Sequence, residues 1–581
     1  MKINPTSNRK MTGLTLALLG LLALLSFALQ QPADTAPLAA LYNPHLGTCF
    51  SFYDETWITL AYEAGSRWDR LDFRWDVIEP TQGAFNFAPH ENVVAFDLEH
   101  GLDIVGILWA TPGWAAACPT DALALHEIAP PPGYPQSRIA AATATSNCPP
   151  ANLTTWTDYI SATVAHFAPL GVHTWEIWNE PDLPLFWRGT PAQYADLLRS
   201  GYLAAKAANP EATVLFGGLA FWHDRDFYFY TQVLAHLATD PNAATHNGYF
   251  DVMSLHLYSD VYTAYDISRE VQQNVARYVG PHPLWLTESG VPIWDEDFTQ
   301  PYPYSATGEE AAAYMLQSYA LARAAGVERY FFFRVHDDYQ PGNAMSERFG
   351  FTRDDHSLRP AYAAYQVAAH YLYGENQITA PLRTPISRVT FWGTPLGRID
   401  VLWNATNAPL TYTQEALLPT ATLVDHRGIT QTLTPISDTY VLPLGPATNN
   451  NHPDGSYIIG GPPLLLIQTD TEAPTTTLHA LLESVATSAI TVSWTVSDTG
   501  AGYWYLELAR APSPTGPWTR VAGWGQTEYV TQTQVQLPAS GTWYFRARAR
   551  DRVGNWERWP AIAQISTTLP ERRLFLPLVS R

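Results

Sequence analysis

The chain has 581 residues, too many for one ordinary core, so we expect two to four domains. Apolar residues make up 46% of the chain and charged residues 15%, which is typical of a packed globular protein and excludes a disordered one. Acidic residues outnumber Lys and Arg by 54 to 33, and the net charge of −21 argues against binding nucleic acid or an anionic membrane, because both need a basic surface.

The N-terminal residues are typical of an export signal. Lys2, Arg9 and Lys10 precede an apolar run over residues 14–29, and small residues follow that run. We therefore predict that residues 1–40 are a signal peptide and linker, and that the protein is secreted or held at the cell surface. The alternative is an uncleaved membrane anchor, because the run is long for a signal peptide.

The sequence contains three cysteines: Cys49, Cys118 and Cys148. Export permits disulfides, and Cys118 and Cys148 bracket a loop rich in Pro, Ala and Thr. We favour a disulfide between these two and a buried thiol at Cys49. Three free cysteines remain the alternative.

Residues 41–375 alternate short apolar runs with helical patterns, as expected for a catalytic barrel domain. Two of the helices begin at predicted capping boxes, Thr190 to Gln193 and Thr307 to Glu310. Eight strand–helix units over roughly 330 residues predict a (β/α)₈ barrel (TIM barrel, class α/β) rather than an open sheet. The runs lie near residues 45–52, 68–73, 103–109, 173–178, 213–217, 252–258, 284–287 and 329–333.

The rest of the chain shows strand patterns and predicts two all-β sandwich domains. Residues 376–470 form the first, an accessory domain. Residues 471–568 resemble a fibronectin type III or immunoglobulin-like module, with Trp494 as a core tryptophan and Tyr544 as a corner tyrosine. Residues 569–581 read as a C-terminal tail, and cell-surface attachment would run through this C-terminal region.

Two glutamates carry the chemical argument. The stretch WEIWNEPD (residues 175–182) places Asn179 and Glu180 at the end of the fourth apolar run, and LWLTESG (residues 284–290) places Glu288 at the end of the seventh. Strand ends of a closed barrel meet at one mouth. Hydrolysis of a glycosidic bond needs two carboxyl groups beside that bond, one protonated and one ionised, about 5–5.5 Å apart in a retaining enzyme. We therefore predict Glu180 and Glu288 as catalytic residues.

These motifs resemble those of clan A glycoside hydrolases, the large group of retaining (β/α)₈ glycosidases. The resemblance covers about residues 45–375 and implies Glu180 as acid/base and Glu288 as nucleophile. EIWNEPD is especially similar to glycoside hydrolase family 39, the β-xylosidase and iduronidase type, whereas family 5 endoglycanases share only the shorter Asn-Glu-Pro core. The segment DRLDFRWDVIEP (residues 69–80), the triplet His256-Leu257-Tyr258 and the motif RPAYAAY (residues 359–365) agree with the resemblance.

Four further residues have expected roles beside the glutamates. Arg70 would keep Glu288 ionised, and Asn179 would hydrogen-bond the substrate 2-hydroxyl. Tyr258 would donate a hydrogen bond to Glu288, and His256 would contact sugar hydroxyls or support Tyr258. The structural alternatives are an ordinary buried ion pair for Arg70, a loop cap for Asn179 and satisfied core polar groups for the other two.

Aromatic side chains are candidate platforms for sugar rings, because a pyranose presents an apolar C–H face to an aromatic ring. The candidates are Trp109, Trp114, Trp187, Trp222 and Trp294, of which we favour Trp109 and Trp294.

Two positions depart from the family pattern. Clan A barrels commonly end strand eight with Trp, whereas this chain reads YFFFRVHDD, so that Phe333, Arg334 or His336 must serve or the floor is built differently. Family 39 also favours Trp where this chain has His173. Both departures bear on which sugar is the substrate and do not bear on the type of reaction.

Competing enzyme classes lack their motifs: the sequence has no Gly-x-Ser-x-Gly, no His-Glu-x-x-His and no glycine-rich phosphate loop before a helix. We predict a secreted retaining glycoside hydrolase that is β-xylosidase-like, acts on a carbohydrate substrate and needs no cofactor or metal. A family 5-like endo-β-glycanase is the first alternative. A non-catalytic surface glycan-binding protein is the second, although such a protein would be marked by loss of either glutamate.

Overall fold

The computed structural model describes residues 43–51, 55–118, 145–221, 228–337, 348–379, 384–525 and 530–571. The expected signal peptide, the end of the C-terminal tail and Trp222 lie outside these residues. Within the described ranges, the helices are all too short or too polar to cross a bilayer.

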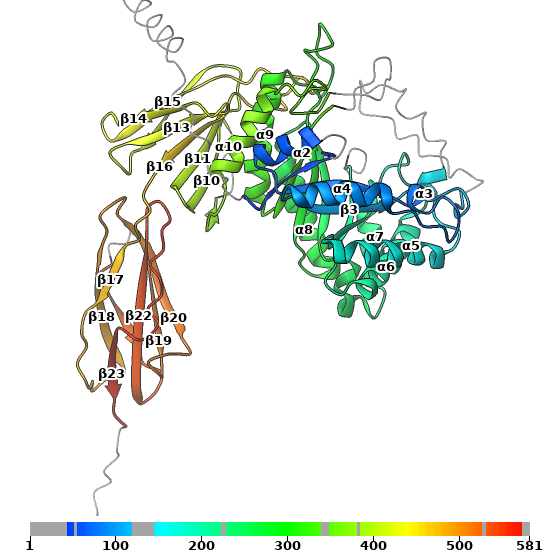
Figure 1. Cartoon of the computed structure of the whole chain (residues 1–581). Coiled ribbons are helices and arrows are strands. Elements are labelled where there is room, and N and C mark those ends of the chain that lie inside the picture. Colours follow the sequence, from blue (N-terminus) through cyan, green and yellow to red (C-terminus); the bar gives the residue numbers. More distant parts are fainter. Residues whose placement is uncertain are drawn as a thin grey trace, which may run out of the picture. The chain divides into compact units, whose positions relative to one another are not determined.

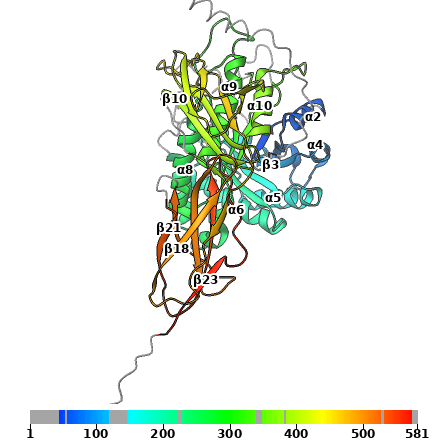
Figure 2. The same cartoon turned by 90° about the vertical axis from the view of Figure 1, so that its left-hand side faces the viewer.

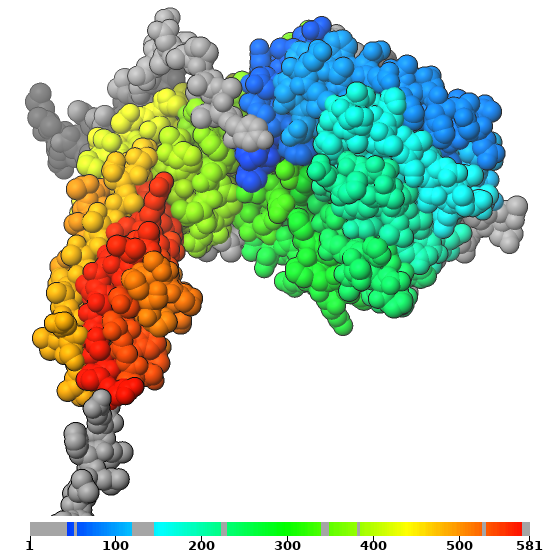
Figure 3. All heavy atoms as spheres, turned by 60° about the horizontal axis from the view of Figure 1, so that its bottom comes forward, coloured from blue at the N-terminus to red at the C-terminus, as the bar shows by residue number. Residues whose placement is uncertain are grey.

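The first eight strands form a closed parallel barrel. Their order in the sheet is β5-β4-β3-β2-β1-β8-β7-β6, and bridges from Leu215 to Val252 and from Leu219 to Leu255 join the two outer strands. In the space-filling view, the blue N-terminal part of the barrel accordingly lies beside the green later part (Figure 3). The strands are β1 (Leu46–Cys49), β2 (Trp68–Arg74), β3 (Asp103–Trp109), β4 (Thr174–Asn179), β5 (Thr213–Gly218), β6 (Met253–Tyr258), β7 (Leu284–Gly290) and β8 (Arg329–Phe332).

A helix follows each barrel strand and packs on the outside of the barrel (Figure 1). The two predicted capping boxes are present: the side chains of Thr190 and Thr307 accept from the backbone N–H of Gln193 and Glu310, whose side chains accept in return. The helices are α2 (Glu55–Ala64), α3 (Trp75–Ile78), α4 (Ala88–Glu99), α5 (Leu153–Phe167), α6 (Pro191–Ala208), α7 (Tyr228–Ala238), α8 (Thr263–Val279), α9 (Gly308–Ala325) and α10 (Pro360–Tyr371).

Two antiparallel sheets follow the barrel, with orders β14-β13-β16-β11-β10-β9 and β12-β15. Apolar residues of this sandwich, among them Phe391, Val401 and Trp403, belong to the same continuous buried cluster as the barrel core. The barrel and the first sandwich therefore share a core. The strands are β9 (Gln377–Ile378), β10 (Ile386–Thr394), β11 (Gly397–Asn404), β12 (Leu410–Glu415), β13 (Ala421–Asp425), β14 (Thr430–Leu433), β15 (Thr439–Leu444) and β16 (Leu464–Gln468).

A second sandwich has sheets of order β17-β18-β21 and β20-β19-β22-β23 (Figures 1 and 2). Its core is a separate cluster that includes Trp494, Leu508 and Phe545. On β22 the buried Phe545, Ala547 and Ala549 alternate with half-buried arginines, as a sheet with one covered face requires. The strands are β17 (Thr475–Leu478), β18 (Ala489–Ser497), β19 (Tyr503–Ala511), β20 (Thr519–Gly525), β21 (Gln532–Gln536), β22 (Gly541–Asp551) and β23 (Ile565–Leu569).

The predicted fold class, a (β/α)₈ barrel followed by all-β sandwich domains, is confirmed. The likeness of the second sandwich to fibronectin type III modules and the four domain limits stay predictions.

The shared core predicts different outcomes for two truncations. A chain ending after residue 470 keeps the barrel and first sandwich together and should stay soluble and monomeric. A chain ending after residue 375 exposes apolar side chains that the first sandwich covers, and most of it should be insoluble. The soluble fraction and gel-filtration profile of the two chains measure this. A soluble, monomeric shorter chain would show that the shared core is dispensable.

Candidate active site

Glu180 immediately follows β4, in a backbone conformation that side chains seldom adopt. Its φ is 44°, and its N–H donates to the carbonyl of Gly218 on β5 at 2.9 Å. The Asp182 carboxylate accepts hydrogen bonds from the N–H groups of Ala220 and Phe221, both at 3.0 Å. The Asn-Glu-Pro-Asp turn is therefore attached to the end of β5, which fixes the direction of the Glu180 side chain.

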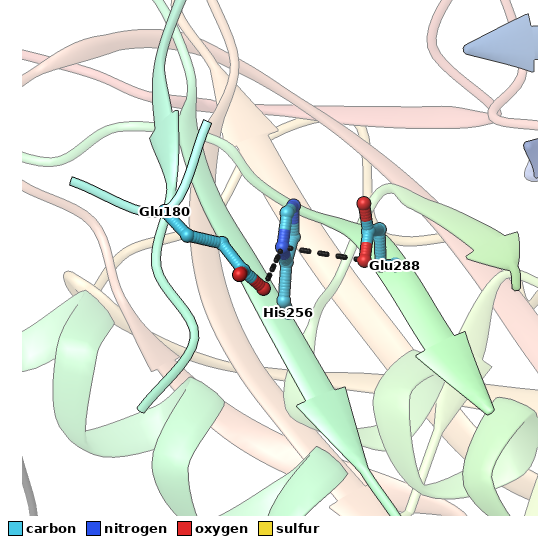
Figure 4. A group of neighbouring side chains, drawn as sticks. All are labelled: Glu180, His256 and Glu288. Carbon is cyan, nitrogen blue, oxygen red and sulfur yellow. Dashed lines mark hydrogen bonds and ion pairs between the residues drawn. The ribbon is translucent and has the colours of Figure 1, made fainter. Parts of the chain in front are cut away.

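Glu288 lies on β7 and faces Glu180 across the barrel mouth. One oxygen of each carboxyl group and one ring nitrogen of His256 all lie within 4.8 Å of one another. The imidazole Nδ1 is 2.9 Å from Glu180 Oε1 and 3.5 Å from Glu288 Oε2, so the ring lies between the two carboxyl groups (Figure 4). The sequence prediction had given His256 a role toward sugar hydroxyls or Tyr258, and the link between the two glutamates was not foreseen.

Arg70 on β2 forms hydrogen bonds with side chains of β4 and β7, and so connects three strands of the barrel. Its guanidinium donates from Nη1 to Glu288 Oε1 at 2.6 Å and from Nη2 to Asn179 Oδ1 at 2.8 Å. Its Nε donates to Glu176 Oε2 at 2.6 Å. Since Arg70 occupies Oδ1 of Asn179, the Nδ2 group of that amide is its donor toward other partners, including a substrate hydroxyl.

Glu176 is a site residue that the sequence prediction missed. It lies on β4 with no exposed surface, and besides Arg70 its carboxylate accepts from Ser254 Oγ at 2.6 Å and Thr287 Oγ1 at 3.2 Å. The sequence held two signals for Glu176. It lies four residues before Glu180, which is the spacing of side chains on one face of a strand. A carboxylate within an apolar strand also needs a buried partner.

Tyr258 at the end of β6 donates its hydroxyl hydrogen bond to Glu288 Oε2. Its ring lies edge-to-face against Phe333, with centroids 5.7 Å apart, and against Phe349, also at 5.7 Å. Of the three candidates to replace the strand-eight tryptophan, Phe333 thus contacts the tyrosine that bonds Glu288. The Arg334 guanidinium lies over the rings of Phe50 and Phe333, and His336 stacks on Trp57. Phe349, on the loop after β8, was not predicted.

His256 has a close neighbour in Gly218. A Cβ atom at position 218 would lie 2.0 Å from the imidazole Nε2, so only glycine leaves room for the ring. Nε2 is buried and makes no hydrogen bond to any residue that the structure describes. The histidine is thus held by packing on one side and by Glu180 on the other.

The two glutamates experience different electrostatic surroundings. Burial raises the pKa of Glu180 well above the ordinary value of a carboxyl group, and the charges of Glu288 and Asp182 raise it further. Burial also raises the pKa of Glu288, but Arg70 and the Tyr258 hydroxyl oppose this rise. These surroundings favour a proton on Glu180 over one on Glu288. Burial and the nearby Arg70 lower the pKa of His256 well below its ordinary value, so the imidazole is neutral.

Two carboxylates and an imidazole at this spacing are also compatible with a metal ion. The Arg70 guanidinium, however, is 2.6 Å from Glu288, and Tyr258 donates to the other oxygen of the same carboxylate. A metal would have to compete with a buried cation for its ligand. We therefore read the cluster as a proton-transfer site.

The tryptophans predicted as sugar platforms lie in different surroundings. Trp109 is 9% exposed, donates to Asp72 Oδ1 at 2.7 Å and has the Arg74 guanidinium over its ring. Trp294, on the loop after β7, is half-buried, and its indole N–H has no hydrogen-bond partner in the described ranges. Trp114 donates to the Glu79 carbonyl, and Trp187 packs on Trp178. The contacts of Trp109 suit packing better than sugar binding, and the unpaired indole nitrogen of Trp294 is itself buried.

The structure contains a disulfide between Cys118 and Cys148, and Cys49 is a buried thiol. The Cys49 Sγ donates to the Thr287 carbonyl at 3.3 Å, and burial together with Glu288 raises the pKa of the thiol. Cys49 is therefore a packing residue beneath the site rather than a nucleophile.

No protein-family model and no curated protein matches the sequence. Solved structures do match the fold. A family 39 glycoside hydrolase from the gut symbiont Bacteroides cellulosilyticus WH2 has a TM-score of 0.54 and 20% identity, covering 74% of this chain and 82% of that one.

Two further structures match with lower scores. A family 30 endoxylanase from Clostridium papyrosolvens C71 has a TM-score of 0.49 and 13% identity, covering 74% of this chain and 98% of that one. A family 39 β-xylosidase from Caulobacter crescentus has a TM-score of 0.48 and 17% identity, covering 76% and 98%. At such identities the first match establishes a common fold, a (β/α)₈ barrel with β domains.

Proposed function

We propose that the protein is a retaining glycoside hydrolase that cleaves β-glycosidic bonds by double displacement. The observation that carries this proposal is the pair of glutamates at the barrel mouth, with one carboxyl oxygen of each within 4.8 Å of the other. The direction of their pKa shifts supports it, because burial raises the pKa of Glu180 well above the ordinary value while Arg70 and Tyr258 oppose the rise at Glu288. Oxygens this close suit direct attack by one carboxylate, since an inverting enzyme separates its carboxyl groups by about 6.5–9.5 Å to admit a water.

In the first step a Glu288 oxygen attacks the anomeric carbon, the bond to the leaving oxygen breaks, and Glu180 gives its proton to that oxygen. His256 determines which Glu180 oxygen acts. Because ionised Glu288 lies 3.5 Å from Nδ1, that nitrogen keeps the imidazole proton and donates a hydrogen bond to Glu180 Oε1. The acidic proton of Glu180 is then on Oε2, the oxygen left for the substrate.

In the second step Glu180 is a carboxylate and takes a proton from water, whose oxygen attacks the anomeric carbon. The bond to Glu288 breaks and its electrons return to the carboxylate, which Arg70 and Tyr258 stabilise through hydrogen bonds. The configuration at the anomeric carbon is retained after two inversions.

β-Xylosidase-like action is the finer proposal, and it rests on the family 39-like motif and on the family of the first structural match. Export is proposed as well, supported by the Cys118–Cys148 disulfide, because disulfides persist in oxidising compartments. The non-catalytic glycan-binding alternative is disfavoured, since mere binding does not require two neighbouring carboxyl groups in different electrostatic surroundings.

Azide distinguishes the roles of the two glutamates. In Glu180→Ala, an activated aryl glycoside needs no protonation, so the glycosyl-enzyme should accumulate and azide should release a glycosyl azide of retained configuration. Hydrolysis of substrates with poor leaving groups should fall by about 10²–10⁴-fold. In Glu288→Ala, azide must attack directly and give the inverted anomer. NMR coupling constants of the azide products identify the anomers.

Exchanged configurations in the two variants would exchange the roles of Glu180 and Glu288. Undiminished hydrolysis in either variant would contradict the two-carboxylate mechanism altogether.

The pH dependence should be bell-shaped, with both limbs above the ordinary carboxyl range, because burial raises both pKa values. Activity falls as pH drops through the Glu288 pKa, since the nucleophile gains a proton. It falls as pH rises through the Glu180 pKa, since the acid loses one. In Glu180→Gln the alkaline limb should vanish for an activated aryl glycoside. A persisting alkaline limb in kcat/KM would assign it to another group.

Product patterns decide between exo and endo action. Aryl β-glycosides, xylan, glucan and mannan should be tested side by side, and we expect aryl β-xyloside cleavage with monomers as the polymer product. A ladder of oligomers analysed by chromatography would favour the family 5-like endo-β-glycanase instead.

A further inference from the structure

One of the connections between the first sandwich and the barrel is the sandwich loop, which we define as residues 445–463 between β15 and β16. Three of its backbone groups bond loops at the barrel mouth and α9. The Val261 N–H donates to the Ile458 carbonyl at 3.0 Å, and the Tyr304 N–H donates to the Asn451 carbonyl at 2.9 Å. The Gly460 N–H donates to Gln317 Oε1 at 2.9 Å.

Gln317 holds the C-terminal end of the sandwich loop through hydrogen bonds to Gly460 and Gly461. This residue of α9 is fully buried, and its Nε2 also donates to the Gly461 carbonyl at 2.8 Å. A Cβ atom at position 460 or 461 would lie 2.2 Å from Trp403 or from the Gly445 carbonyl, respectively. The loop therefore has one close-packed path along α9.

Two asparagines fix the other end. The Nδ2 groups of Asn449 and Asn451 both donate to the Ser305 carbonyl, at 2.9 and 2.8 Å. Asn449 Nδ2 is also 3.0 Å from Glu310 Oε2, the carboxylate that completes the capping box of α9. The His452 ring lies edge-to-face on Tyr304, at 5.3 Å. The sandwich loop thus holds the segment that leads into α9.

From Tyr304 the contacts continue to the catalytic strands. The Tyr304 carbonyl accepts from Ser259 Oγ at 3.0 Å, and the Ser259 N–H donates to the Gly290 carbonyl at 2.9 Å. Ser259 directly follows Tyr258, and Gly290 lies two residues after Glu288. Ser259 and Tyr304 have φ values of 66° and 63°, which side chains seldom adopt, so neighbouring contacts must stabilise both conformations.

We propose that the sandwich loop positions the nucleophile, and that Asn451 is the positioning residue through which it acts. Asn451 holds Tyr304 and Ser305, Tyr304 holds Ser259, and Ser259 sets the end of β6 from which Tyr258 donates to Glu288. On this proposal the first sandwich helps to position the active-site residues, besides covering apolar surface of the barrel. This inference rests on the proposed function.

Kinetics of Asn451→Ala in the full chain test the proposal. The substitution keeps the backbone carbonyl that accepts from Tyr304 and removes the Asn451 Nδ2 bond to the Ser305 carbonyl. Loss of that bond should loosen the segment and with it Tyr258, and a small misplacement of a catalytic group is costly, so kcat for an aryl glycoside should fall about 10-fold with KM little changed. A weaker Tyr258 hydrogen bond also stabilises ionised Glu288 less. The acidic limb of the pH profile should therefore move to higher pH.

Asn404→Ala is the matched control. Asn404 is buried; its Nδ2 donates to the Ala408 carbonyl at 2.6 Å, and its Oδ1 accepts from the N–H and the hydroxyl of Thr406, both at 2.8 Å. Its loss also costs the sandwich side-chain hydrogen bonds, but these bonds stay within the sandwich. This control should lower the unfolding temperature and leave kcat and the acidic limb unchanged. Equal kinetic effects in both variants, or wild-type kinetics in Asn451→Ala, would overturn the proposal.

Crystal structures of the wild type and Asn451→Ala provide a readout without activity. We expect displaced Ser259 and Tyr258 in the variant, and an unmoved Tyr258 hydroxyl would overturn the positioning role whether or not a substrate has been found. Full activity of Glu288→Ala would instead refute the proposed function and not the path of contacts.

Discussion

The site depends on one buried cation. The Arg70 guanidinium bonds Glu176, Asn179 and Glu288 at once, and so ties β2, β4 and β7 together at the barrel mouth. Removing one partner from a buried ion pair costs about 3–5 kcal/mol, because the remaining charge has lost its compensation. The same cation acts on the electrostatics of the site, since its contact with Glu288 opposes the rise in the pKa of that carboxyl group. Arg70 therefore contributes both to the stability of the barrel mouth and to its electrostatics.

Much of this arrangement follows from local patterns. The apolar runs and the capping boxes at Thr190 and Thr307 predict the barrel, and polar residues at the ends of buried runs predict Glu180 and Glu288. Glu176 escaped prediction because a carboxylate inside a strand signals its role only through partners on other strands. Phe349 escaped for a similar reason, since it reaches Tyr258 from a loop. The tryptophans were the least predictable, because the exposure of a ring such as Trp109 depends on what the folded chain packs against it.

The barrel and first sandwich are not independent modules. A single apolar core runs through both, and Glu310 illustrates the same continuity in polar contacts. Its carboxylate caps α9 and also accepts from Thr448 Oγ1 at 2.7 Å and from Asn449. The start of a barrel helix and the docking of the sandwich are thus stabilised by one side chain, so the two regions gain stability together rather than as independent modules.

The close approach of Gly218 and His256 has a consequence for how this sequence can change over evolutionary time. A methyl group at position 218 would occupy the place of the imidazole Nε2, whereas a smaller residue at position 256 would leave an empty space beside the glycine and release Glu180 Oε1. A substitution at either position alone would therefore disturb Glu180. We expect Gly218 and His256 to be retained together or replaced together in related sequences.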